Sequence, residues 1–314
     1  MTFICFWHVI VHGYGFSLYG EPGFSTKGDL RIIIFFCTLF SPATYCFMFI
    51  SGWFGIKFSL RKFFYFAFTG IICSICTITF RFFVGDIDYW FPIITRLFPI
   101  ACQKWWFLTG YIMVFLISPF IEAGLISIEK NTLKHIIYIM TFIEVASFII
   151  LRDYIGRSFY GLLYIYILAR YLRKINFNCS VKALIITYIF SFTTLWTISY
   201  FAVFLGKFKW VSWILLGSYN NPAIIIMSVT IFLFINKLRT THNKWLNWAF
   251  ENVLVIYLLT EGIGLFLYKY EANLIDYSFI MGILFVFMTI IISLVIGKII
   301  SQLFKTCIRK ITLT

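Results

Sequence analysis

Charged residues are scarce in this chain. Asp, Glu, Lys and Arg make up 12% of its 314 residues, whereas hydrophobic residues make up 61% and the mean hydropathy is +0.93. A soluble domain carries about twice that charged fraction, and no water-soluble fold of this size could bury so much apolar surface. The composition excludes a soluble globular enzyme, a disordered chain and a disulfide-stapled secreted domain. It predicts an all-α, polytopic transmembrane helix bundle.

Motifs for nucleotides and metals are also missing. The sequence has no P-loop, no Rossmann fingerprint and no Cys/His group with zinc spacing, so we expect no metal. Cys73 and Cys76 form a C-x-x-C inside an apolar string, where packing is the favoured role. The net charge of +14 comes from basic residues between apolar runs, which indicates membrane orientation rather than nucleic-acid binding.

Ten apolar segments follow one another along the chain, and most are long enough to cross the bilayer as helices. They run approximately over 3–19, 32–54, 63–83, 105–125, 134–151, 157–173, 182–205, 211–235, 251–268 and 277–300. We therefore expect one integral membrane domain over residues 1–314 with about ten spans. If the N-terminus is cytoplasmic, 16 of the 26 Lys and Arg lie on the inner side. This bias predicts that both termini are cytoplasmic.

Ionisable side chains inside apolar segments are costly and mark candidate functional groups. His8 and His12 lie one helical turn apart in the first segment. His8 is either a general base that removes a proton from a hydroxyl or a histidine hydrogen-bonded between helices. His12 lies nearer the outer interface, where a solvated histidine is favoured. Glu261 can orient a histidine, accept a sugar hydroxyl or bond a neighbouring helix, and Gly262 and Gly264 allow close approach.

Other polar residues lie inside or beside the segments. Glu144 is expected to have a structural role, and Asn220 and Asn221 precede Pro222 within the eighth segment. The cluster after the second segment either sets topology and contacts lipid headgroups or binds the phosphates of an anionic donor such as coenzyme A. Its members are Lys57, Arg61 and Lys62. On the outer side, the aromatic residues Tyr89 and Trp90 can stack on sugar rings.

Five strings in order resemble the acyltransferase 3 family of membrane O-acyltransferases, and most closely its branch from surface-polysaccharide gene clusters. They are FWHVIVHGYG (6–15), FMFISGWFGIKFSLRKF (47–63), KWWFLTGYIMVFLISPFIE (104–122), YNNPAIIIMSVTIFLFINKL (219–238) and ENVLVIYLLTEGIG (251–264). Two features depart from the family. Its Arg upstream of the first-span histidine would precede Met1, so we expect that the chain starts late relative to its relatives or has lost activity. Thr260 replaces the family's histidine before Glu261.

The resemblance implies transfer of an acyl group, usually acetyl from cytoplasmic acetyl-CoA, to a hydroxyl of a carbohydrate or lipid-linked glycan in surface-polysaccharide biosynthesis. It implies a location in the bacterial cytoplasmic membrane. His8 would be the general base or a transient acyl relay. Groups that position or polarise the reactants would be His12, Glu261 and Asn221. The donor phosphates would be bound by Arg61, Lys62 and Lys57. The acceptor would be contacted by Trp106, Asn220, Asn221, Tyr89 and Trp90. A transporter or flippase of lipid-linked sugars and a degenerate, non-catalytic membrane subunit are the alternatives.

Overall fold

The computed structural model describes residues 2–13, 29–83, 97–150, 156–204, 216–238, 247–248, 252–264 and 279–311. Its regular structure is helical, with no strand in these ranges, which confirms the all-α prediction. The chain divides into two compact units. Unit 1 comprises residues 1–16, 59–105 and 241–314, and unit 2 comprises residues 17–58 and 106–240. The single domain over 1–314 stays a prediction.

By length and composition, six helical stretches among the described residues can span a membrane. They are Leu30–Phe54, Leu60–Phe83, Trp106–Ser127, Lys130–Ile149, Val181–Phe204 and Gly282–Cys307. Each matches one of the predicted segments. The other four predicted segments contain helices that are shorter within the described ranges. The multi-pass helical character is therefore supported, and ten spans stay a prediction.

The long helices expose large apolar side chains. On α9 (Val181–Phe204), Ile186 is 56% exposed and Phe190 is 70% exposed, and on α16 (Phe279–Ile311) Ile291 is 61% exposed. Large exposed apolar side chains along a helix are unfavourable in water and mark a face that contacts lipid or another protein. It supports a bilayer as the surroundings of these helices.

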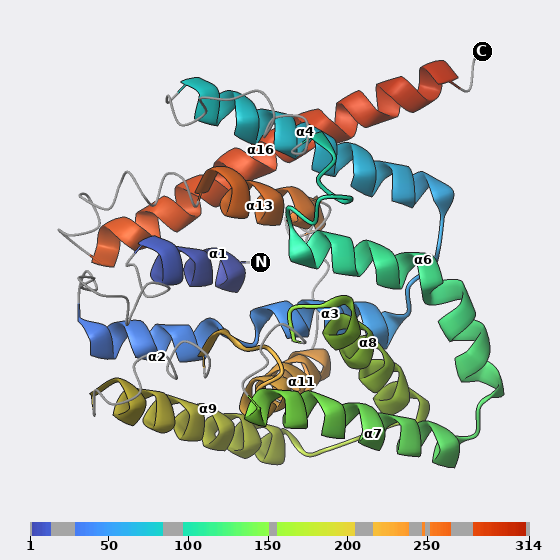
Figure 1. The fold of residues 1–314 in the computed structure, drawn as a ribbon, viewed down its shortest axis with the longest axis vertical. Coiled ribbons are helices and arrows are strands. Elements are labelled where there is room, and N and C mark those ends of the chain that lie inside the picture. The colour runs from blue at the N-terminus through green and yellow to red at the C-terminus, as the bar shows by residue number, and fades with distance from the viewer. Residues whose placement is uncertain are drawn as a thin grey trace. The chain divides into compact units, whose positions relative to one another are not determined.

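Unit 1 packs short helices against two long ones. Its elements are α1 (Thr2–His8), η1 (Val9–Gly13), α4 (Leu60–Phe83), α13 (Val253–Leu259), η4 (Thr260–Gly264) and α16. The short helix α13 contacts both α16 and α4 (Figure 1). Helix α1 contacts α16 and η4. A Cβ on Gly262 would lie 2.6 Å from Thr77 Oγ1 on α4. This confirms the prediction that Gly262 lets another helix approach closely.

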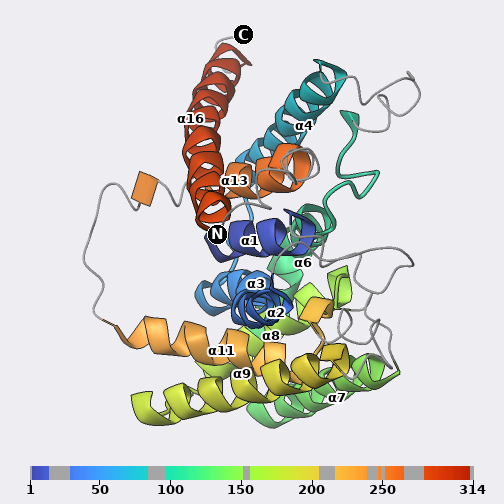
Figure 2. The ribbon, with the colours of Figure 1, turned by 90° about the vertical axis from the view of Figure 1, so that its left-hand side faces the viewer.

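Within the described ranges, unit 2 contains seven helices. They are α2 (Leu30–Phe40), α3 (Ala43–Phe54), α6 (Trp106–Ser127), α7 (Lys130–Ile149), α8 (Phe159–Lys174), α9 and α11 (Pro222–Lys237). Helix α9 lies beside α11 (Figure 2) and also contacts α2. Helix α3 crosses α8 so closely that a Cβ on Gly52 would lie 2.6 Å from the Tyr166 carbonyl oxygen. Only glycine permits that backbone approach.

A proline inside α6 changes the direction of this helix. Pro119 has no N–H, so the Phe115 carbonyl four residues earlier loses its helical donor. The Ser118 hydroxyl donates to that carbonyl at 2.8 Å and restores the hydrogen bond, as serine does beside prolines in membrane helices. Figure 1 shows α6 bending along its length. The part after Pro119 carries Glu122 and Leu125, which contact α8.

Candidate functional site

The structure places the predicted catalytic histidine in the interior of unit 1. His8 ends α1 and is 8% exposed. Its ring centroid lies 6.4 Å from that of Tyr257 on α13, with the two rings tilted by 40°. Cys5, one turn earlier on α1, is hydrogen-bonded with Thr260 at the start of η4. These two contacts bring α1 against the helical stretch that carries Glu261.

Both predicted catalytic groups are next to helical irregularities. The π-helical segment η1 begins directly after His8, and the π-helical segment η4 contains the half-buried Glu261. These are the two π-helical segments within the described ranges. Such segments are rare, and they occur frequently at functional sites because an extra residue in the turn redirects side chains. The irregularity thus coincides with both predicted groups.

Two neighbouring residues are placed differently from His8. The backbone of His12 is part of η1, and its side chain is outside the described part of the structure. Thr260, which replaces the histidine of the resembled family, donates its hydroxyl to the Ile256 carbonyl at 2.7 Å. That hydrogen bond is within its own helical stretch. Thr260 therefore bonds both within its own helical stretch and to Cys5 of α1.

Sequence reasoning overlooked Tyr257. It is buried, its ring is next to that of His8, and it precedes Glu261 by four residues in the same helical stretch. The i, i+4 spacing of a tyrosine and a glutamate in an apolar segment is the signal that could have identified it.

The predicted donor-binding cations are on the protein surface. Arg61 and Lys62 are exposed in the first turn of α4 in unit 1, and Lys57 is exposed in unit 2. The first turn of α4 contains no acidic residue. Cations at a helix N-terminus oppose the helix dipole, so Arg61 and Lys62 do not serve the stability of α4. Their position suits contact with external anions.

Asn220 and Asn221 have structural partners in unit 2. Asn220 is buried and donates its Nδ2 to Ser147 Oγ at 2.9 Å, and a Cβ on Gly156 would lie 2.5 Å from its backbone nitrogen. The Asn221 side chain caps α11 by accepting from Ala223 N at 2.9 Å, and Pro222 occupies the first helical position. This is a regular helix start. Acceptor binding by these two asparagines stays a prediction.

Trp106 belongs to an aromatic group next to these asparagines. Its ring stacks on Tyr219 with centroids 5.4 Å apart, and Tyr219 also contacts Tyr45 at 5.6 Å. The Arg157 guanidinium carbon lies 5.9 Å from the Tyr219 centroid, and its Nη2 donates to Gly217 O at 2.8 Å. The structure therefore places Trp106 against Tyr219, the residue that precedes Asn220 and Asn221. Tyr89 and Trp90 lie outside the described residues.

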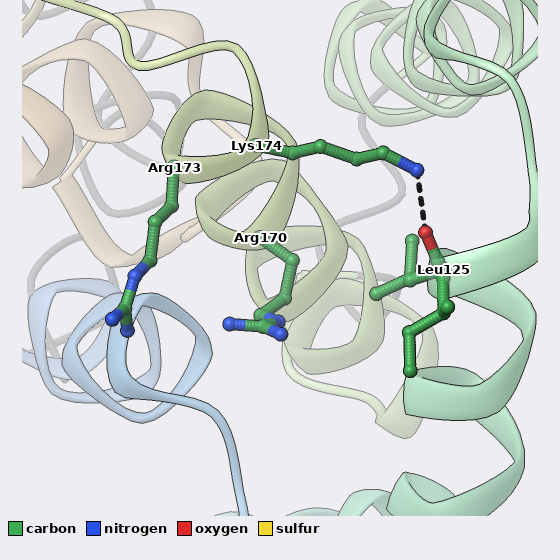
Figure 3. Close-up of a pocket in the computed structure, with 5 residues that line it drawn as sticks. Leu125, Arg170, Arg173 and Lys174 are labelled. Carbon is green, nitrogen blue, oxygen red and sulfur yellow. Dashed lines mark hydrogen bonds between the residues drawn. The ribbon is translucent and has the colours of Figure 1, made fainter.

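A basic pocket in unit 2 is the main feature that sequence reasoning missed. It has a volume of about 310 Å³ and is lined by Leu125, Ile126, Arg170, Arg173 and Lys174 (Figure 3). The three cations lie on the last turns of α8, and the two apolar residues lie near the end of α6. In the sequence, Arg170, Arg173 and Lys174 contribute only to the charge bias that predicts orientation.

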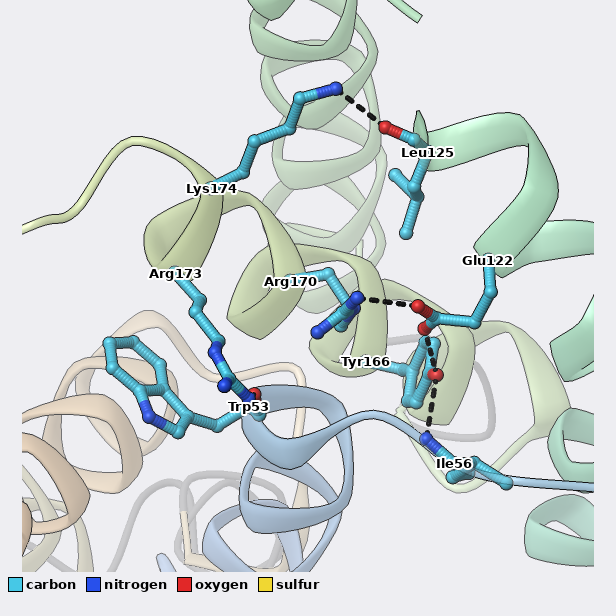
Figure 4. A network of polar contacts seen from close by, with 8 residues as sticks. All are labelled: Trp53, Ile56, Glu122, Leu125, Tyr166, Arg170, Arg173 and Lys174. Atoms are coloured by element: carbon cyan, nitrogen blue, oxygen red, sulfur yellow. Dashed lines mark hydrogen bonds and ion pairs between the residues drawn. The ribbon is translucent and has the colours of Figure 1, made fainter. Parts of the chain in front are cut away.

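A polar network supports this pocket (Figure 4). Ile56 N donates to Tyr166 Oη at 3.1 Å, and Tyr166 Oη donates to Glu122 Oε1 at 2.5 Å. Glu122 Oε2 accepts from Arg170 Nη2 at 2.5 Å. The chain of contacts joins the segment after α3 to α6 and α8. It fixes Glu122 and Arg170 in one arrangement.

Glu144 is fully buried in α7. Neither of its carboxylate oxygens has a hydrogen-bond partner among the described residues. A buried carboxyl group without partners is costly and calls for an explanation, either structural or functional. The structural role expected from the sequence stays a prediction.

Within the described ranges, no three His, Cys, Asp or Glu side chains gather where they could hold a metal ion. No protein-family model, curated protein or solved structure compared with the chain matches it. Function must therefore be argued from the residues themselves.

Proposed function

We propose that this chain is a membrane O-acyltransferase that moves an acyl group, acetyl in the first instance, from acyl-CoA to a hydroxyl of a carbohydrate or lipid-linked glycan in surface-polysaccharide biosynthesis. The observation that carries the proposal is the contact between α1 and η4, which sets a buried His8 against Tyr257 and the Glu261-bearing turn. Acyl transfer to an alcohol needs a positioned base that takes the hydroxyl proton, and a histidine can do this near neutral pH.

The chemistry requires one proton acceptor. His8 removes the proton of the acceptor hydroxyl while the oxygen attacks the thioester carbonyl carbon. The tetrahedral intermediate then collapses, the carbon–sulfur bond breaks, and the departing CoA thiolate takes the proton from the His8 imidazolium. Glu261 stabilises the transient imidazolium by its negative charge, and Tyr257 holds the imidazole ring in place.

The donor is anionic, and two exposed cations of unit 1 suit it. Arg61 and Lys62 lie where the first backbone N–H groups of α4 are also unpaired within the helix. A phosphate at such a helix start is stabilised by the unpaired N–H groups and the helix dipole, whereas a cation without a bound anion is destabilised there. Under the proposed orientation, with both termini in the cytoplasm of a bacterial inner membrane, this end of α4 faces cytoplasmic acyl-CoA.

Labelled acetyl transfer into polysaccharide tests the proposal. Membranes bearing His8→Ala are expected to transfer about 10²–10⁴-fold more slowly than wild type, which is the usual effect of removing a general base. His135→Ala is the matched control, because His135 is an exposed histidine on α7. Equal transfer by wild type and His8→Ala would exclude His8 as the base.

A transporter of lipid-linked sugars is the second candidate, and Glu144 is the observation that favours it. Buried carboxyl groups inside membrane spans often carry protons or ions in transporters. The acyltransferase proposal expects Glu144→Gln to retain acetyl transfer and to be as stable as wild type or up to about 1 kcal/mol more stable, because an amide costs less to bury. Loss of polysaccharide export with acetylation retained would instead favour the transporter.

A further inference from the structure

The basic pocket of unit 2 carries more positive charge than its protein partners neutralise. Arg170, Arg173 and Lys174 line it, and Glu122 forms the one ion pair recorded with these three cations among the described residues. Glu129 follows Ile128 at the pocket's edge, but it is exposed and makes no ion pair with them there. Two positive charges therefore remain without a compensating carboxylate.

Most hydrogen-bond donors of these cations are also unused. Arg170 donates only its Nη2 to Glu122, and its buried Nε has no acceptor among the described residues. Arg173 donates Nη1 to the Trp53 carbonyl oxygen, and Lys174 donates to Leu125 O at 2.5 Å and Ile128 O at 2.7 Å. A guanidinium has five N–H donors and an ammonium has three. Several donors of the two guanidiniums are thus available to a ligand.

Helix capping explains only part of this arrangement. Lys174 and Arg173 satisfy carbonyls at the ends of α6 and α3, and cations are favourable at the end of α8 itself. Those contacts require one or two donors from each side chain. They do not account for the unpaired Nε of Arg170 or for the open volume between the cations.

The geometry points to a binding site for a phosphate group in this pocket. Phosphate oxygens accept several hydrogen bonds at once, and two guanidiniums with one ammonium supply the forked and point-charge donors that phosphate binds best. The volume of about 310 Å³ is at the lower end of the range for small-molecule sites. It suits a phosphorylated headgroup or a terminal phosphate.

The apolar wall of the pocket also suits a phosphate that is carried by an amphipathic molecule. Leu125 is buried, whereas Ile126 is 82% exposed beside it. An acyl chain or another apolar tail can lie along that surface while its phosphate meets α8. This inference does not depend on the acyltransferase proposal, because the pocket shares no residue with His8, Tyr257 or Glu261.

Two probes distinguish the source of the phosphate. Thermal unfolding of the full chain in detergent is measured with increasing pyrophosphate, and unfolding in vesicles is compared between phosphatidylcholine alone and phosphatidylcholine mixed with phosphatidylglycerol. We expect wild type to be stabilised by at least one probe. Stabilisation by pyrophosphate indicates a soluble phosphate ligand, and stabilisation by phosphatidylglycerol alone indicates a lipid headgroup. Wild type unaffected by both probes overturns the inference.

Variants show whether the pocket is responsible. Arg173→Gln and Lys174→Gln each remove one pocket cation and are expected to need about tenfold more of the stabilising probe, since a hydrogen bond to a charged group is lost. Lys182→Gln changes the net charge equally at an exposed position of α9 and is expected to respond as wild type. Thermal unfolding measured without a probe shows which variants are folded. If Arg173→Gln is not folded, Arg173→Lys, which keeps the charge, is measured in its place. If the folded pocket variants respond as wild type does, the inference is wrong.

Discussion

The two units hold their polar side chains by different means. In unit 2, Glu122 is tied to Arg170 and Tyr166, and through Tyr166 to the backbone after α3. In unit 1, Glu261 lies in a π-helical turn that packs against the helix of His8. A carboxylate held by several donors stabilises packing, whereas irregular turns such as that of Glu261 are frequent at functional sites. Substitutions at matched positions in the two units test this difference.

The largest effect on stability is expected when glycines at close helix crossings are replaced by alanine. A Cβ on Gly52 would lie 2.6 Å from the backbone oxygen of Tyr166 and 2.8 Å from Ala169 Cβ, so Gly52→Ala separates α3 from α8. We expect unit 2 to lose about 3 kcal/mol of unfolding free energy. Gly262→Ala in unit 1 meets only the side chain of Thr77 and is expected to cost less. Thermal unfolding of the two variants measures the ranking.

Gly124→Ala is the control for these substitutions. A Cβ there has nothing within 4 Å, and the residue lies inside α6, so alanine is expected to be neutral or to stabilise by about 0.5–1 kcal/mol. If Gly52→Ala unfolds at the same temperature as Gly124→Ala, the close crossing of α3 and α8 is not what stabilises unit 2.

The next effect is expected at Glu122. Glu122→Gln removes the charge that Arg170 and Tyr166 contact, which costs about 2 kcal/mol because hydrogen bonds to charged groups contribute ~1.5–3 kcal/mol. The same change leaves the basic pocket more positive, so phosphate should bind more tightly while stability falls. Glu129→Gln, at an exposed acid, is expected to change stability by less than about 0.5 kcal/mol. Equal effects of the two variants would contradict a stabilising network at Glu122.

Local sequence patterns predicted the helices. The features that these patterns did not predict depend on contacts between residues far apart in the sequence. The apolar runs predicted helices because lipid leaves backbone groups no other partner. The capping of α11 by Asn221 follows a local rule, since Asn followed by Pro is typical of a helix start, while its contact with an acceptor stays a prediction.

The basic pocket could not be predicted from spacing alone. It forms only where α6, bent at Pro119, meets the end of α8 some 50 residues later, as shown by the Lys174 contact with Leu125 across 49 positions. A lone Glu122 in an apolar segment and three cations within Arg170–Lys174 were the available signals. Neither signal indicates which partner it has, because pairing depends on tertiary structure.

The smallest effect is expected from Glu261→Gln. This variant should lose activity and keep its stability, whereas Glu122→Gln should lose stability and keep its activity. Glu261→Gln removes a charge that stabilises the His8 imidazolium, so we expect acetyl transfer to fall about tenfold, equivalent to ~1.4 kcal/mol in the barrier. The loss should appear in kcat with KM unchanged, and the unfolding temperature should stay near that of wild type. Glu122→Gln should instead lower stability and leave kcat intact in the folded fraction. If Glu261→Gln loses stability as Glu122→Gln does and keeps its kcat, both carboxylates are structural and the contrast between the units disappears.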